Sequence, residues 1–178
     1  MKRYALTAIG RDRPGIVASV TKALYEHDCN IEDSSMTILE DEFAIILIMA
    51  MPEDKDPASL GRALKAVEKS MGLTIHFKEI PARTKAPAPA SNYIITLHGA
   101  DKAGIVYRCT EALTRHNVNI TDLETKVVGG EKKVYIMVME VWTPAGADIK
   151  GLESELDSIS RSLGVTIRIK PIEAFEPL

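Results

Sequence analysis

Apolar and polar positions in the first half of the chain alternate between strand-like and helix-like spacing. A short apolar run precedes Gly10, and apolar residues then recur on one helical face from Ile16 to Leu24. A hairpin pattern and a second helical stripe follow, the latter bounded by Asp56-Pro57 and Gly72. The pattern predicts strand, helix, strand, strand, helix and strand over residues 4–9, 16–24, 31–39, 43–51, 57–71 and 73–80.

The second half of the chain repeats this pattern. Residues 93–122 match residues 4–33 at a constant offset of 89, and the offset grows to 92 later in the copy. The three extra residues fall between the two strands of the hairpin, where insertions commonly collect. The second copy predicts elements over residues 93–98, 105–116, 120–128, 134–142, 149–163 and 165–172.

The order βαββαβ in each half predicts the α+β class, with two ferredoxin-like units. Each unit would hold a four-stranded antiparallel sheet in the order 4-1-3-2, with both helices on one face. We expect domains at residues 1–80 and 92–178, joined by a semi-rigid Pro/Ala-rich linker at residues 81–91. Units of about eighty residues are marginal alone, so we expect them to dock together or to dimerise.

The strand at residues 43–51 is apolar on both of its alternating faces, as is much of the strand at residues 134–142. A strand of this kind is usually covered on both sides. Either the sheet face opposite the helices packs on another sheet or subunit, which would give a homodimer, or its Ile and Val residues merely reflect β-propensity.

Composition narrows the class of protein further. The chain has 178 residues and a formal net charge of −3, with no basic stripe, which argues against direct nucleic-acid binding. Its two cysteines occupy non-equivalent positions, and Cys109 lies on an apolar helix stripe, where a core role is expected. A cytoplasmic location fits this cysteine usage. The longest apolar run is too short to cross a membrane, and we expect no membrane partner.

The most specific local signal is a glycine-bearing turn before the first helix, from Gly10 to Gly15, followed by Asn30. Asp12 would cap the helix and Pro14 would occupy its first turn, while Asn30 would reverse the chain and open the next strand. Unpaired N–H groups at a helix start bind a carboxylate, and an Asn side chain or a carbonyl could hold an ammonium group. The motif therefore indicates a free amino acid as ligand. The alternative is that Asp12 and Pro14 only start the helix and Asn30 only forms a turn.

These residues resemble the signature of ACT domains, which are βαββαβ regulatory modules that commonly bind amino acids. The resemblance covers nearly the whole chain as two modules, and the arrangement is similar to the group of glycine cleavage system transcriptional repressors. It implies ligand contacts from the loop after the first strand and from the asparagine before the second strand. The implied ligand-binding residues are Gly10, Asp12, Gly15, Ile16, Asn30 and Ile31, and in the second copy Gly99, Asp101, Gly104, Ile105, Asn119 and Ile120.

The second copy departs from this signature. Ala103 replaces Pro14, and His98 replaces Ile9 just before the loop. His98 either reaches a ligand or is a solvated residue at a strand end. We therefore expect two sites that are not equivalent.

Other chemistries find little support in the sequence. His27 and His116 are equivalent in the repeat, but each ends a helix, where a histidine is favourable in itself. We expect no metal, no cofactor and no catalytic residue. RNA binding would need aromatic residues on the central strands, which offer Ile46, Ile48 and Met139 instead.

The resemblance thus implies a regulatory protein that senses an amino acid, with glycine or serine as candidates. It would act through a protein partner such as a transcriptional regulator. Two other classes stay open: a structural or interaction module that has lost its ligand and assembles through its sheets, and an enzyme of unrecognised type.

Overall fold

A computed structural model describes residues 1–82, 90–130 and 133–172. The chain divides into two compact units, Met1–Ala86 and Pro87–Leu178. The first unit contains β1 (Lys2–Arg11), α1 (Ile16–Tyr25), β2 (Asn30–Leu39), β3 (Glu42–Met51), α2 (Pro57–Met71) and β4 (Thr74–Ile80). The second contains β5 (Tyr93–Gly99), α3 (Ile105–Arg115), β6 (Asn119–Val128), β7 (Val134–Trp142), α4 (Ile149–Leu163) and β8 (Val165–Pro171).

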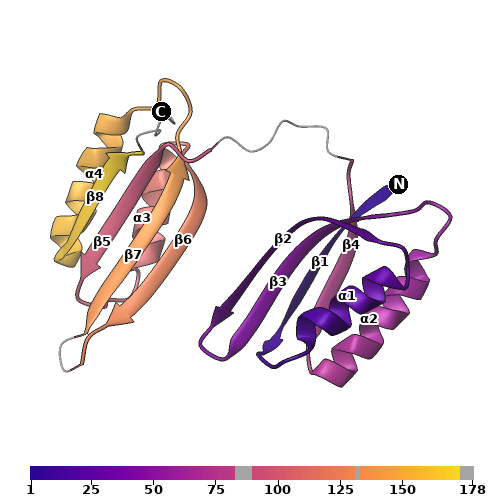
Figure 1. Ribbon diagram of the computed structural model, residues 1–178. Helices are drawn as coiled ribbons and strands as arrows, with labels where there is room; N and C mark the ends of the chain where they lie inside the picture. Colours follow the sequence, from indigo (N-terminus) through magenta and orange to yellow (C-terminus); the bar gives the residue numbers. More distant parts are fainter. Residues whose placement is uncertain (83–89, 131–132, 173–178) are drawn as a thin grey trace, which may run out of the picture. The chain divides into compact units, whose positions relative to one another are not determined.

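Each unit is one four-stranded antiparallel sheet with its two helices on one face (Figure 1). The strand orders are β2-β3-β1-β4 and β6-β7-β5-β8. This confirms the predicted α+β class with two ferredoxin-like units, and it confirms the predicted order 4-1-3-2. Most of the predicted linker, at residues 83–89, lies outside the described residues, so the proposed domain boundaries at 80 and 92 stay predictions.

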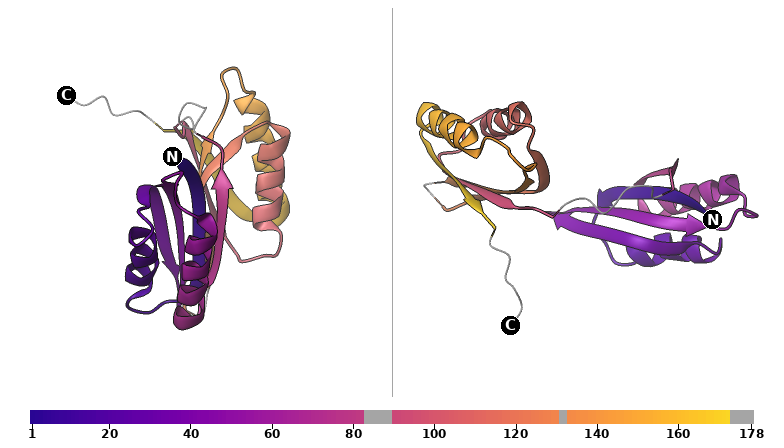
Figure 2. Two further views of the ribbon diagram at one scale, coloured as in Figure 1. Left: turned by 90° about the vertical axis from the view of Figure 1, so that its right-hand side faces the viewer. Right: turned by 90° about the horizontal axis from the view of Figure 1, so that it is seen from above.

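The core of each unit lies between the sheet and the helix pair. The right-hand view of Figure 2 shows α3 and α4 on one side of the sheet of the second unit. In the first unit the alternating residues Leu6 and Leu47 of the sheet meet Val20 and Leu60 of the helices, and all four are nearly inaccessible. In the second unit Cys109 is fully buried on α3, which confirms its predicted core role. Burial raises the pKa of the Cys109 thiol to about 11, so this sulfur stays protonated and inert.

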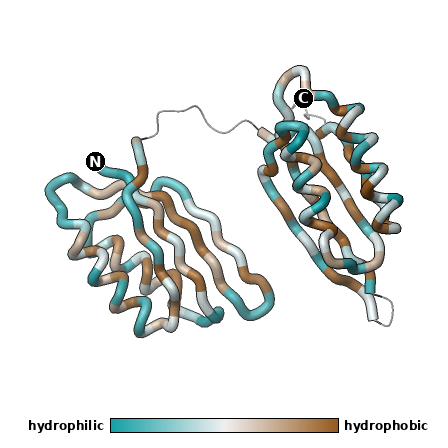
Figure 3. The backbone as a smooth tube through the Cα atoms, turned by 180° about the vertical axis from the view of Figure 1, so that it is seen from behind, coloured by the Kyte–Doolittle hydropathy of each residue, from teal (hydrophilic) through white to brown (hydrophobic). Residues whose placement is uncertain are grey.

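In each unit no described helix or strand covers the sheet face opposite the helices, which is called the bare face below. In the first unit Ile9 and Ile46 are 53% and 47% exposed on this face, and Thr7 pairs with Ile46 across the strands. Apolar residues continue along β3 in the hydropathy view of Figure 3. In the second unit the corresponding strands present His98 and Glu140 as exposed residues, so that its bare face is the more polar of the two. Met139 of β7 is fully buried on the helix side of this sheet.

The helix ends show which sequence signals control them. Asp56 caps α2 by accepting hydrogen bonds from the Ala58 and Ser59 N–H groups at 2.9 and 3.1 Å, and Gly72 ends the helix in the left-handed conformation. Both residues behave as the sequence predicts. Of the helices in the described part of the chain, none combines the length and apolar composition needed to cross a membrane.

Candidate functional site

The candidate site of the first unit begins at the loop between β1 and α1. Its residues Asp12, Arg13 and Pro14 are exposed, and Gly15 follows with φ of 94°. The Asp12 N–H donates to the Asp41 carbonyl at 2.7 Å, which ties the loop to the β2–β3 hairpin. Because Gly15 has a left-handed backbone that other residues adopt only with strain, this position requires glycine.

Helix α1 starts without a side-chain cap. Its N-cap residue is Gly15, which has no side chain, and its first turn contains no acidic residue. This corrects two predictions: Asp12 does not cap the helix, and Pro14 lies in the turn before it rather than in its first turn. The first N–H groups of α1 therefore remain available to an anion.

The loop of the second unit repeats this geometry with other residues. Gly104 is the N-cap of α3 with φ of 88°, and again no side chain caps the helix. The first intrahelical hydrogen bond runs from the Arg108 N–H to the Gly104 carbonyl at 3.0 Å, matching the bond from the Ser19 N–H to the Gly15 carbonyl at 2.9 Å. Asp101 is exposed in this loop, as Asp12 is in the first.

The other two helices are capped, and the contrast is informative. Asp56 caps α2, and Asp148 caps α4 by accepting from the Gly151 N–H at 2.9 Å. An aspartate thus neutralises the positive end of the two helices that begin away from the candidate loops. The two helices that begin at the candidate loops are left open in both copies.

Asn30 and Asn119 lie far from these loops within their own units. Asn30 pairs with Ala50, which pairs with Arg3 near the start of β1, whereas Gly10 pairs with Phe43 near its end. Gly10 lies seven positions after Arg3 along the strand, a span of about 23 Å. The arrowheads of β1 and β2 lie at the same end of the sheet in Figure 1, so the start of β2 faces away from the loop. One amino acid cannot reach the Gly15 loop and Asn30 of a single unit.

The asparagines nevertheless lie at a local irregularity that both copies share. A β-bulge follows Asn30 between Ile31 and Asp33, and another follows Asn119 between Ile120 and Asp122. Bulges often re-aim side chains next to functional sites. Both asparagine side chains are exposed. The chain reversal expected at Asn30 belongs to Asp28, whose φ is 55°, because Asn30 is already the first strand residue.

The isoleucines among the predicted site residues are divided between core and surface. Ile16 and Ile105 are each 2% exposed and pack in the cores, so only their backbone N–H groups could face a ligand. Ile31 is 39% exposed, and Ile120 is half-buried against the core of its unit. Gly10 lies one residue before the end of β1 and Gly99 ends β5. A Cβ at these positions would lie 2.9 Å from the Gly72 carbonyl oxygen and 2.7 Å from Val165 Cγ1.

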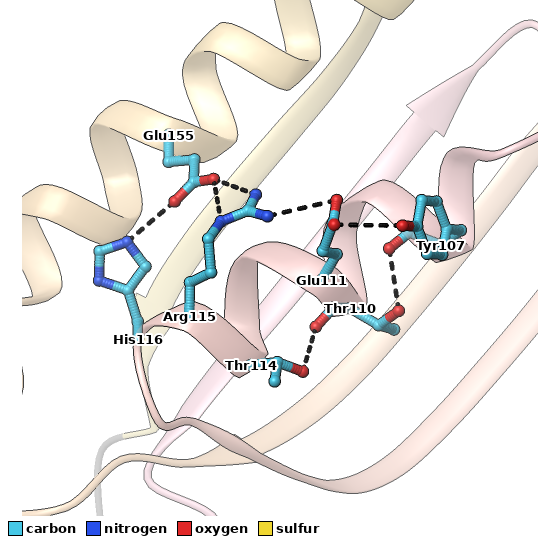
Figure 4. A network of polar contacts seen from close by, with 7 residues as sticks. All are labelled: Tyr107, Thr110, Glu111, Thr114, Arg115, His116 and Glu155. Atoms are coloured by element: carbon cyan, nitrogen blue, oxygen red, sulfur yellow. Dashed lines mark hydrogen bonds and ion pairs between the residues drawn. The ribbon is translucent and has the colours of Figure 1, made fainter.

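His27 and His116 join the two helices of each unit in different ways. His27 lies beyond the end of α1 rather than in its last turn, with Nδ1 2.8 Å from the Ala23 carbonyl and Nε2 3.3 Å from Ser59 Oγ. His116 Nε2 lies 3.0 Å from Glu155 Oε2, in a network that includes Arg115 (Figure 4). Among the described residues no cluster of three His, Cys, Asp or Glu side chains could hold a metal ion.

Two contacts at the candidate loops were missed by the sequence analysis. Arg13 donates to the Ser70 carbonyl at 2.6 Å, and Lys102 donates to the Leu163 carbonyl at 2.6 Å. Arg13 and Lys102 occupy equivalent positions in the repeat, so their shared basic charge was the sequence signal that could have revealed these contacts.

Each unit also has a hollow between its second helix and its last strand. The volumes are about 270 Å³ in the first unit and 310 Å³ in the second, and the floors are formed by Leu64 and Phe77 and by Leu156 and Ile169. None of the predicted site residues lines either hollow. The two hollows therefore do not support a preformed ligand cavity at the candidate loops.

The family model described as ACT domain matches this chain twice, over residues 4–78 and 92–170. The chain is similar to the glycine cleavage system transcriptional repressor of Escherichia coli, with 28% identity over 169 residues that cover 89% of this chain and 84% of that protein. It is also similar to a UPF0237 protein of Methanopyrus kandleri, with 40% identity over 76 residues that cover 42% of this chain and 84% of that protein.

A solved structure of a protein from Galdieria sulphuraria shares the fold. It has a TM-score of 0.78 and 24% identity, and the match covers 97% of this chain and 99% of that one. Both copies of the βαββαβ unit thus have their counterpart in a solved structure.

Proposed function

The chain belongs to the ACT domain family, with one module in each half, and on that premise we propose that it senses a free amino acid and regulates a protein partner. The regulated process would be transcriptional or metabolic. The similarity to the Escherichia coli repressor supports this direction, and it makes glycine and serine the first candidates for the ligand.

The observation that carries the proposal is the selective absence of caps. Helices α1 and α3 begin at the candidate loops with uncapped N–H groups, while Asp56 and Asp148 cap α2 and α4. An uncapped helix start offers several donors and a positive partial charge to one carboxylate. Every free amino acid carries such a carboxylate.

The ammonium group of the ligand needs a second set of contacts. Within one unit Asn30 is about 23 Å from the loop, a span inferred from strand register. We therefore propose that the protein is a homodimer in which the Asn30 end of one copy completes the loop of another. In this arrangement each site has two halves. One half is a loop with the start of its helix, from Gly10 to Ile16 or from Gly99 to Ile105. The other half is the start of a strand, with Asn30 and Ile31 or with Asn119 and Ile120.

The effect on transcription would be indirect. The net charge of −3 disfavours the phosphate contacts that dominate DNA binding, and the proposed partner is a DNA-binding regulator. The protein acts in the cytoplasm, without catalysis of its own. The amino acid tunes the contact with the partner.

A second candidate function is favoured by the bare sheet face of the first unit. Ile9 and Ile46 are about half exposed there, and they line a shallow hollow of about 210 Å³ with Thr7. Exposed apolar surface of this kind marks interaction sites. A module that assembles through its sheets without any ligand would use this face.

Calorimetric titration of the full chain with glycine, L-serine and a panel of other amino acids separates these functions. The decisive variant is Val17→Glu, because Val17 is exposed in the first turn of α1 and a carboxylate there suits the helix dipole. The same carboxylate repels that of a ligand, and we expect about tenfold weaker binding at this site. Val17→Gln is the matched neutral control and should bind normally.

Asn30→Ala should also abolish heat at one class of site, whereas Ser35→Ala, on the same exposed strand, should not. Silence of the wild-type chain across the panel would contradict amino-acid sensing and leave the sheet-assembly function. Specific, salt-resistant binding of the purified protein to DNA in a gel-shift experiment would contradict the indirect role.

A further inference from the structure

The residue that follows the loop aspartate is basic in both copies, and in both it donates to a carbonyl near the end of the second helix, although the two acceptors differ by one position in the repeat. Arg13 Nη2 reaches the Ser70 carbonyl and Lys102 Nζ reaches the Leu163 carbonyl, each at 2.6 Å. Both carbonyls lie in the last turn of the second helix, α2 or α4, where carbonyls have no intrahelical partner. A cation is favourable at this negative end of the helix dipole.

A second contact holds each loop against the turn between the second helix and the last strand, which is called the corner below. A Cβ on Gly10 would lie 2.9 Å from the Gly72 carbonyl oxygen, and one on Gly99 would lie 2.7 Å from Val165 Cγ1. The end of β1 or β5 is thus packed directly on the turn between the second helix and the last strand. The loop is fixed at this corner before and after its aspartate.

We propose that Arg13 and Lys102 are positioning residues of the two candidate sites. Each holds the loop, and with it the uncapped N–H groups of α1 or α3, against the end of the second helix. In this role Arg13 Nη2 and Lys102 Nζ are directed to the helix carbonyls and hold the loop rather than the ligand. The part of this inference that concerns a ligand rests on the proposed function.

The positioning role couples the loop to the corner. A loop that opens must release the Ser70 carbonyl, and a helix end that frays must release Arg13. An amino acid that holds the loop closed therefore also protects the corner, and the coupling is reciprocal. The amide N–H groups that report it are Asp12 and Ser19 in the loop region and Leu73 at the corner, which donate to the Asp41, Gly15 and Glu68 carbonyls.

Amide hydrogen exchange by NMR on the full chain, without ligand, tests this directly. Arg13→Met should speed exchange of the Asp12, Ser19 and Leu73 amides by about two- to five-fold, the loss of one exposed cation at a helix end. Arg13→Lys should restore the wild-type rates, because a lysine at the equivalent position bonds to a carbonyl of the last helical turn in the second unit. Lys78→Met removes an equal charge from an exposed position on β4, and it should leave the three rates unchanged because Lys78 makes no ion pair with another described residue.

Lys102→Met and Lys102→Arg form the parallel pair for the second unit. The Arg108 amide should exchange faster in the first variant and normally in the second, while the Asp12 amide responds to neither. Unchanged exchange in Arg13→Met, failure of Arg13→Lys to restore it, or an equal effect of Lys78→Met would each overturn the positioning role.

Titration with glycine and L-serine adds a second measurement. If the wild-type chain binds, Arg13→Met should weaken the affinity of one site by about two- to five-fold and Arg13→Lys should restore it. Unchanged affinity in Arg13→Met would overturn the ligand part of the proposal. If the wild-type chain binds neither, the proposed ligands are wrong, and the exchange rates alone decide the positioning role.

Discussion

The two candidate loops have nearly the same backbone but different side chains. Gly15 and Gly104 occupy the N-cap positions with φ of 94° and 88° and offer no side-chain cap, and Arg13 and Lys102 both bond to the end of the second helix. Pro14 in the first loop is Ala103 in the second. The loop shape therefore depends on the left-handed glycine and the basic residue, and the proline is not needed to produce it.

The helix pairs behind these loops have diverged instead. In the first unit His27 contacts Ser59, and Lys22 and Glu26 form an exposed pair on α1 at 3.7 Å. In the second unit Arg115 of α3 and the following residue His116 both contact Glu155 of α4. The copies keep the geometry that the loops share and differ where the helices merely have to pack, which is the pattern expected when the loops carry the function.

The largest effect should come from Gly15→Ala and Gly104→Ala. Each places a Cβ on a left-handed backbone and should cost about 1–2 kcal/mol of unfolding free energy. Neither site is crowded, with Met71 Cε at 3.7 Å from a Cβ on Gly15 and nothing within 4 Å of one on Gly104, so the two losses should be equal. Urea unfolding of the full chain, followed by circular dichroism, measures both.

Gly61→Ala is the matched control. Gly61 lies inside α2 with nothing within 4 Å of its added Cβ, so alanine should stabilise the helix by about 0.5–1 kcal/mol. Unequal losses at Gly15 and Gly104 would mean that the two loops do not share one backbone requirement.

The order of the strands and helices could be predicted because it depends on the local periodicity of apolar residues. The ends of α2 at Asp56 and Gly72 could also be predicted, because both are local signals. The start of α1 could not, because Asp12 and Pro14 suit a helix start locally while the bonds from Asp12 to Asp41 and from Arg13 to Ser70 hold the loop outside the helix. Such contacts join residues that are distant in sequence, and the periodicity of apolar residues does not predict them.

The motif was predictable as a set of residues but not as an arrangement. Gly15 and Asn30 are close in sequence, and a compact site was the natural interpretation. In the structure α1 runs between them and carries the chain from one end of the sheet to the other. Only the strand register shows that each unit holds two separated halves of the predicted site.

A smaller effect should separate the helix pairs. The Arg115 guanidinium, and then His116, hold the pKa of Glu155 below its usual range. A carboxylate with a depressed pKa stabilises the fold above its unfolded pKa, near 4.5, and the stabilisation is lost as pH falls through the lower folded value. Glu155→Gln should therefore cost about 1 kcal/mol at neutral pH and progressively less below about pH 4.5.

Fluorescence of Trp142 reports this change, because it is the single tryptophan of the chain and lies on β7 of the second unit. Glu26→Gln in the first unit, which breaks an exposed pair with Lys22, should change stability by less than about 0.5 kcal/mol at any pH. A loss in Glu155→Gln that does not depend on pH would show that packing, not charge, joins α3 to α4.

The smallest effect should come from Ala103→Pro, which gives the second loop the proline of the first. The flanking glycines have nearly equal φ, and the Ala103 N–H donates to no backbone carbonyl among the described residues. A proline that fits an existing conformation stabilises mainly by restricting the unfolded chain, here by about 0.5 kcal/mol, and Pro14→Ala should lose about as much. Urea unfolding followed by Trp142 fluorescence measures the gain. Destabilisation by Ala103→Pro would show that the backbone conformation of the second loop at this residue does not fit a proline. The two loops would then differ in backbone conformation and not only in rigidity.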